Sequence, residues 1–150
     1  PPYKEDYYFN KALTSEVLCA EAEKVAKNPG DADACFNFGV TLAQLGLIDK
    51  ALEQLRRFVI LKPDDRDGHY LLANLLADEG YDDQAIREFE TTIALDPAFG
   101  EAYFYLAKHY ENLGDFEPAE KLYEHVLGQS AETELIEEAR QRLEKILNWR

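Results

Sequence analysis

The chain has 150 residues, and its thirty Asp and Glu against sixteen Lys and Arg give a formal net charge of −14 at pH 7. Nucleic acids and anionic membranes are poor partners for such a chain, because affinity for phosphate backbones depends largely on Lys and Arg. No stretch approaches the roughly 20 consecutive apolar residues of a membrane span. A chain of this length can form one domain or a short repeat array with a continuous core.

Residues 1–31 are expected to form a helix pair. The stretch TSEVLCAEAEKVAKNPG, residues 14–30, predicts a helix that ends at Pro29, because proline cannot continue a helix. Its partner would be a helix over residues 3–11, which gives a degenerate first unit. The sequence does not begin with methionine, so we take it as a processed chain or as a piece of a longer one.

The two cysteines, Cys19 and Cys35, lack the C-x-x-C spacing and are too few for a disulfide framework. We expect them to be buried thiols in a reducing compartment, and we therefore expect the protein to be cytoplasmic. A bridge between the two is the alternative.

From residue 32 onward the sequence repeats with a period of 34 residues. Prolines, glycines and alanines recur at this spacing: Pro29, Pro63 and Pro97; Gly46, Gly80 and Gly114; Ala51, Ala85 and Ala119. A fixed period in this range predicts stacked supersecondary units, because one short unit cannot bury its own apolar face. Each unit is interpreted as two helices, the first ending near its glycine and the second at its proline. The units are residues 32–65, 66–99 and 100–133.

The residues between these markers resemble the tetratricopeptide repeat (TPR) family. The family pattern of the first helix, and then that of the second, is found in each unit: Cys35, Phe38, Gly39, Leu42, Ala51, Leu55, Val59 and Pro63; His69, Leu72, Ala73, Leu76, Ala85, Phe89, Ile93 and Pro97; Tyr103, Leu106, Ala107, Tyr110, Ala119, Tyr123 and Leu127. The match covers residues 32 to about 128. It departs from the family where Cys35 and His69 replace an aromatic residue and where Ala131 replaces the third proline. The resemblance implies a single all-α TPR domain over residues 1–150, an α-solenoid of antiparallel helix hairpins in a right-handed superhelical stack.

Residues 134–150 are expected to form a C-terminal capping helix. Apolar residues in this stretch recur at spacings of three and four, with charged residues on the other side: Leu135, Ala139, Leu143 and Ile146. Repeat arrays need an end with a polar outer face to stay soluble, which is the role we assign to this helix.

The stretch EAYFYLAKHY, residues 101–110, is apolar on more than one side of the expected helix. At about 100° per residue the side chains of this helix divide into a packing arc and a second arc: Tyr103, Leu106, Ala107 and Tyr110 in the first, Glu101, Phe104, Tyr105, Lys108, Glu111 and Asn112 in the second. The second arc is not needed for packing between helices, so we expect it to be free to hold a partner.

In TPR proteins this second arc lines a concave groove that commonly binds peptides, and the resemblance implies the same surface here. Reading its positions at a period of 34 gives the expected groove residues: Asp33, Phe36, Asn37, Val40, Asp67, Tyr70, Leu71, Asn74, Glu101, Phe104, Tyr105 and Lys108. Such a groove would be aromatic along its floor and acidic along one margin. The alternative is that the aromatic residues pack against the adjacent first helix.

The best-known TPR binding mode holds the acidic C-terminal tail of heat-shock chaperones with Lys, Asn and Arg side chains. In this chain Phe36 and Val40 stand where that mode needs Lys and Asn, and Asp67 stands where it needs Lys. An acidic tail would also meet like charges, which are costly at an interface. We therefore exclude the chaperone tail and expect a partner segment with apolar side chains and some Lys or Arg.

The sequence contains no motif for catalysis, a metal or a cofactor. The histidines, His69, His109 and His125, form no H-x-x-x-H pair, and no cysteine lies at metal-ligand spacing from them. Neither Ser15 nor Ser130 lies in a G-x-S-x-G motif, and no glycine-rich phosphate loop is found. We expect a chain that is not an enzyme and binds no cofactor.

Together these patterns predict a non-catalytic protein-interaction scaffold that binds a partner peptide in its groove. The alternative is an assembly module that self-associates or packs against flanking parts of its own chain. That alternative rests on the two ends, because residues 1–9 include four aromatics and Trp149 follows the last apolar turn.

Overall fold

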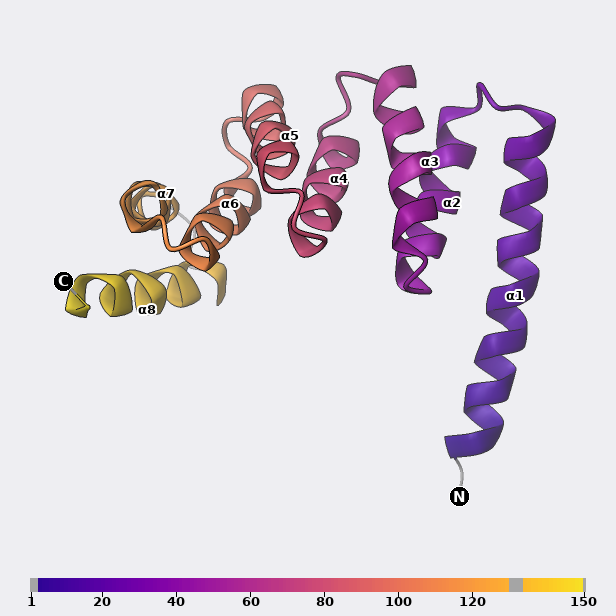
Figure 1. The fold of residues 1–150 in the computed structure, drawn as a ribbon, viewed down its shortest axis with the longest axis horizontal. Coiled ribbons are helices and arrows are strands. Elements are labelled where there is room, and N and C mark those ends of the chain that lie inside the picture. Colours follow the sequence, from indigo (N-terminus) through magenta and orange to yellow (C-terminus); the bar gives the residue numbers. More distant parts are fainter. Residues whose placement is uncertain (1–2, 130–133, 150) are drawn as a thin grey trace. The chain divides into compact units, whose positions relative to one another are not determined.

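The computed structural model describes the backbone of residues 3–129 and 134–149 and the side chains of residues 15–129 and 134–149. Within these ranges the chain forms eight α-helices and no strand: α1 Tyr3–Lys27, α2 Ala32–Gln44, α3 Ile48–Leu61, α4 Arg66–Asp78, α5 Asp82–Leu95, α6 Gly100–Asn112, α7 Phe116–Leu127 and α8 Glu134–Asn148 (Figure 1). The predicted all-α fold built from adjacent helix pairs is confirmed. Two compact units, Pro1–Gly68 and His69–Arg150, divide the chain.

The first helix, α1, is continuous over 25 residues and differs from the helix pair expected for residues 1–31. No Gly or Pro lies between Pro2 and Pro29, so no residue in this stretch interrupts the hydrogen bonds of the helix. Near its C-terminal end, Val25 joins a buried cluster with Cys35 of α2 and Phe58 of α3.

The helices α2 and α3 approach closely at Gly39, the small residue of the repeat pattern. A Cβ atom at this position would lie 3.0 Å from Leu55 Cγ, so a larger residue would require the Leu55 side chain to shift. The start of α2 is fixed by Asp31, whose Oδ1 accepts a hydrogen bond from the Ala34 amide at 3.1 Å.

The glycines that recur at period 34 end the first helix of each pair. Gly46, Gly80 and Gly114 have φ of 74°, 79° and 78°, the left-handed conformation that glycine adopts at little cost. After the first of them, the Leu47 amide donates to the Leu42 carbonyl at 2.9 Å, as in a Schellman cap. These helix ends lie where the sequence predicts them.

Two buried clusters of described residues lie in the unit His69–Arg150. One joins Ala73 of α4, Phe89 of α5 and Leu106 of α6. The other joins α6, α7 and α8: Phe104, Ala107, Ala119, Tyr123, Val126, Ile136, Ala139, Leu143 and Ile146. The capping helix α8, yellow in Figure 1, therefore buries its apolar side in this unit, as its spacing predicts.

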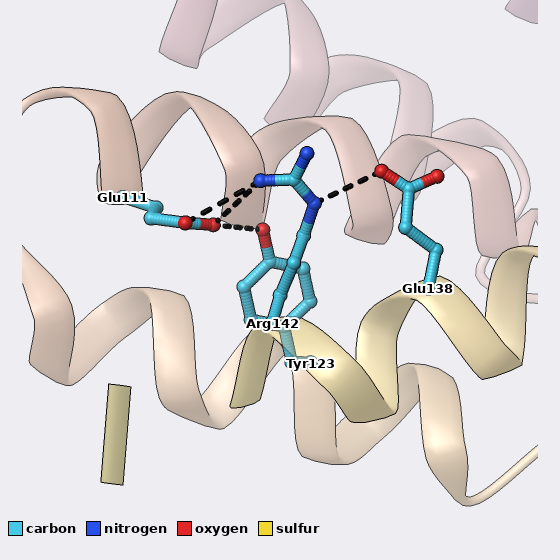
Figure 2. A network of polar contacts seen from close by, with 4 residues as sticks. All are labelled: Glu111, Tyr123, Glu138 and Arg142. Atoms are coloured by element: carbon cyan, nitrogen blue, oxygen red, sulfur yellow. Dashed lines mark hydrogen bonds and ion pairs between the residues drawn. The ribbon is translucent and has the colours of Figure 1, made fainter. Parts of the chain in front are cut away.

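A network of polar contacts fixes α8 to α6 and α7 (Figure 2). The Tyr123 hydroxyl donates to Glu111 Oε2 at 2.6 Å, and the Arg142 guanidinium lies 3.2 Å from the same oxygen. Arg142 Nε also donates to Glu138 Oε1 at 3.0 Å. Burial and the adjacent Glu111 carboxylate raise the pKa of Tyr123 far above its usual value, so it acts as a neutral donor.

The residue that replaces an aromatic in the second repeat, His69, is buried in a structural role. Its Nδ1 lies 2.6 Å from Glu88 Oε2, which links α4 to α5. A buried polar ring is tolerated when it is hydrogen-bonded, and this partner supplies that bond.

Candidate functional site

The twelve residues expected to line the groove divide between the two units. The unit Pro1–Gly68 holds Asp33, Phe36, Asn37, Val40 and Asp67, and the unit His69–Arg150 holds Tyr70, Leu71, Asn74, Glu101, Phe104, Tyr105 and Lys108.

In the first unit, the two apolar residues of this group are half-buried. The ring centroid of Phe36 lies 4.8 Å from that of Phe58, so part of the Phe36 surface is used for packing. Val40, one turn further along α2, is also half-buried. Neither side chain is fully free to hold a partner.

The polar residues of the same group lie on the surface of the first unit. Asp33 is exposed and lies 3.4 Å from Lys62 Nζ. Asp67 is exposed and lies 3.0 Å from the guanidinium of Arg66, and Asn37 is exposed as well. Both carboxylates thus have a basic neighbour within the chain.

In the second unit, Tyr70 is the centre of an aromatic cluster. Its ring centroid lies 5.0 Å from that of Phe99, 6.1 Å from that of Tyr105 and 6.4 Å from that of Phe89. Burial, together with the adjacent Tyr105, raises the pKa of Tyr70 to about 12. The hydroxyl of Tyr70 is therefore protonated at neutral pH.

Three of the expected groove residues line one hollow, which we call the α4–α6 pocket. Its volume is about 170 Å³, and its walls come from the C-terminal halves of α4 and α6 and from α5: Asn74, Ala77, Asp78, Phe89, Tyr105, Lys108, His109 and Asn112. The pocket thus combines an aromatic wall with two amides, a carboxylate and an ammonium group.

The polar groups of the α4–α6 pocket are only partly engaged within the protein. Asn74 Nδ2 donates to the Tyr70 carbonyl at 2.9 Å, and Lys108 Nζ lies 5.9 Å from the Tyr105 ring centroid. Among the residues that the structure describes, no carboxylate lies within ion-pair distance of Lys108. This cation therefore faces the pocket without a charged partner.

His109 also lines the pocket but was not expected there, whereas Asn112 lies in the second arc of the helical wheel. The ring of His109 is buried, and its Nε2 lies 3.2 Å from Asp82 Oδ1 without the alignment of a hydrogen bond. Both residues follow a predicted one at a spacing of four, His109 after Tyr105 and Asn112 after Lys108. That spacing places each pair on one side of α6 and is the signal that could have identified His109.

The expectation of a free aromatic ring at Phe104 is wrong. Phe104 is 1% exposed and belongs to the buried cluster of α6, α7 and α8, with its ring centroid 5.8 Å from that of Tyr123. The next residue, Tyr105, is half-buried and does line the pocket. Of the remaining two expected residues in this unit, Leu71 is half-buried and Glu101 is exposed.

The expectation of two buried cysteines holds for one of them. Cys35 is buried and Cys19 is exposed, and both are free thiols. Burial raises the pKa of the Cys35 thiol. In the parts of the chain that the structure describes, no cluster of three His, Cys, Asp or Glu side chains could hold a metal ion. No helix in those same parts is long and apolar enough to span a bilayer.

Comparison with known structures gives the same architecture. The crystal structure of MamA superposes with a TM-score of 0.77 at 22% identity, over 95% of this chain and 92% of that one. YrrB, a TPR protein with an unusual peptide-binding site, gives 0.79 at 21% identity, over 91% and 70%. A MamA fragment from Desulfovibrio magneticus RS-1 gives 0.74 at 18% identity, over 81% and 71%. At these identities the likeness establishes the fold.

The sequence itself matches no curated protein at a significant level. Two family models, each described as tetratricopeptide repeat, match residues 36–82 and 76–143. Together they cover residues 36–143, which include all but the first four residues of the three repeats and most of α8. The chain therefore belongs to the tetratricopeptide repeat family.

Proposed function

We propose that the chain is a non-catalytic protein-interaction scaffold that binds an extended partner segment at the α4–α6 pocket. The observation that carries the proposal is the combination of Tyr105, Asn74 and the unpaired Lys108 in one hollow beside Tyr70. Half-exposed tyrosine rings offer a large contact area for little loss of side-chain entropy, which is why they recur as binding anchors.

The pocket chemistry favours a partner with apolar side chains and some basic residues. An apolar side chain would lie against Tyr105 and Phe89, and the amides of Asn74 and Asn112 would hydrogen-bond the partner backbone. The carboxylate of Asp78 lines the same pocket and would pair with a Lys or Arg of the partner. Lys108 would donate to a backbone carbonyl.

Two further points support this reading. The fold resembles that of YrrB, a TPR protein for which a peptide-binding site is named, and the resemblance to the TPR family implies a groove of the kind that commonly binds peptides. If two or three anchors supply most of the binding free energy, an affinity near 1 μM, about −8 kcal/mol, is expected. In the first unit, Asp33, Phe36, Asn37, Val40 and Asp67 stay a prediction from the sequence.

A peptide library tests the proposal across many partner sequences at once. Random dodecapeptides displayed on phage are selected on the wild-type protein, and the enriched peptides are synthesised and measured by fluorescence anisotropy. We expect sequences that combine apolar and basic residues. The double substitution Asn74→Ala and Tyr105→Ala should weaken their binding about tenfold, since each truncation removes an anchor.

The matched control is Tyr81→Ala, which removes an exposed tyrosine that does not line the pocket. Circular dichroism and thermal melting would establish that each variant is folded. Equal affinity of the wild-type protein and the double variant for every enriched peptide would contradict the proposed site.

A further inference from the structure

A second hollow lies between α6, the start of α7 and the end of α8, and we call it the α6–α8 cleft. Its volume is about 300 Å³, and its lining is Glu111, Asn112, Phe116, Lys145, Ile146 and Trp149. Both aromatic residues of this lining are exposed to solvent, Trp149 to 88% and Phe116 to 42%. Two exposed aromatic side chains thus gather at one hollow instead of being scattered singly, and gathered apolar surface is the kind that marks interaction sites.

The α6–α8 cleft adjoins the α4–α6 pocket, because Asn112 lines both. From this shared residue we infer that the cleft is a second anchor for the same partner segment, and that it takes one large apolar side chain of that segment. The inference rests on the proposed function, and it adds a specificity position that the sequence pattern of the groove did not include.

The chemistry of the cleft fits an apolar side chain in an extended backbone. Phe116, Ile146 and Trp149 supply apolar walls, while Asn112 and Lys145 supply donors at the edge for backbone carbonyls. The arrangement of hydrophobic walls with few polar groups is the usual composition of ligand sites in proteins.

The cleft is held in shape before any partner binds. Glu111 on its wall accepts from Tyr123 and from Arg142, so the network of Figure 2 fixes α8 against α6. The Trp149 amide donates to the Lys145 carbonyl at 3.2 Å, which ties its backbone to the last turn of α8. A pre-formed site loses less conformational entropy on binding.

Charge decides between a partner segment and a second copy of this chain as the occupant. Residues 134–150, which supply Lys145, Ile146 and Trp149 of the lining, sum to zero, but the whole unit of residues 69–150 has 18 acidic against 7 basic residues and a net charge of −11. Two copies that met here would bring like charges together, which opposes association. A segment with basic residues beside its apolar anchor gains from the same charges.

Trp149 is the single tryptophan of the chain, so its fluorescence reports on the cleft directly. The probe is the synthetic dodecapeptide that enriches most strongly on the wild-type protein, chosen without Trp. Saturating the wild-type protein with this peptide should shift the emission maximum of Trp149 to shorter wavelength, because the indole ring leaves water. Trp149→Ala should weaken its binding about tenfold, whereas Leu147→Ala, an exposed residue of the same turn outside the cleft, should leave it unchanged.

The outcomes separate this inference from the proposed function. One outcome would overturn the second anchor alone. In it, the Asn74→Ala and Tyr105→Ala double variant loses binding, Trp149→Ala keeps its affinity, and the Trp149 emission of the wild-type protein does not shift on binding. Equal binding by all variants would overturn both. Light scattering that shows a wild-type dimer and a monomeric Trp149→Ala variant would assign the cleft to a second copy and overturn the inference.

Discussion

Phe104 and Tyr105 are neighbours in α6 with opposite roles. Their ring planes are nearly perpendicular, at 89°, and Phe104 lies in the core while Tyr105 lines the α4–α6 pocket. A side chain as large as Phe104 that is almost fully buried stabilises the fold through the apolar area it removes from water and through the volume it fills. A half-buried residue that serves binding removes less apolar area from water and fills less of the core, so it stabilises the fold less.

Phe104→Ala should therefore lower the free energy of unfolding by about 3 to 5 kcal/mol, the usual cost of removing a buried aromatic ring. Urea denaturation followed by circular dichroism measures this loss. Tyr105→Ala is the matched control and should cost less, because its ring is only half-buried. A small loss in Phe104→Ala, or a larger loss in Tyr105→Ala, would contradict the assignment of the two roles.

The helical wheel separates Tyr105 and Lys108 from the packing residues of α6, and the period of 34 adds Asn74 of α4; all three line one hollow, but the wheel misplaces Phe104. A wheel describes one helix alone, and it cannot show that Phe104 shares a buried cluster with Tyr123 of α7 and the apolar residues of α8. The packing arc of α6 is wider than its repeat signature suggests, because α8 follows α6 in the stack. Only the position of a helix distant in sequence determines this.

At the scale of the helices, the repeat period predicts where the first helix of each pair begins, because α2, α4 and α6 begin at Ala32, Arg66 and Gly100, the expected starts of the three units. A glycine with positive φ ends α2, α4 and α6, and its role follows from backbone sterics alone. For residues 1–31 the expected turn rested on register with later repeats, with no Gly or Pro to form it, and α1 is continuous. Periodicity thus predicts a helix boundary reliably where a residue with special backbone geometry accompanies it.

The attachment of α8 depends on polar contacts as well as on its apolar side. Glu111 and Arg142 are each about one quarter exposed or less, and Glu111 also accepts from Tyr123. Glu111→Gln removes the charge that Tyr123 and Arg142 both face, so the free energy of unfolding should fall. We expect a fall of about 1 to 2 kcal/mol, because partial exposure to solvent weakens the interaction. Thermal and urea denaturation measure this change.

Glu124→Gln on α7 is the control, because Glu124 is exposed and its change should stay within about 0.5 kcal/mol. Hydrogen exchange adds a local readout: in Glu111→Gln the amides of α8 should lose protection before those of α4 and α5. Equal stability of the two variants would mean that apolar packing alone holds α8.

For the whole molecule, the dominant property is its net charge of −14. Like-charged residues lie one helical turn apart at several places, among them Glu120 with Glu124 and Glu134 with Glu138. Such pairs destabilise a helix by about 0.2 to 0.5 kcal/mol each, so weakening several of these repulsions should raise the free energy of unfolding by about 1 kcal/mol. Salt screens these repulsions, and it also screens the attraction between the acidic surface and a basic partner.

Raising NaCl from about 50 mM to about 500 mM, across which the Debye length falls several-fold, should therefore move two measurements in opposite directions. The melting temperature of the free protein should rise, and its affinity for an enriched basic peptide should fall. KCl at the same ionic strength should act alike, since screening does not depend on which monovalent cation is used. Affinity that is independent of salt would mean that the partner is held by the aromatic and apolar walls alone, and the acidic residues around the pocket would then serve solubility.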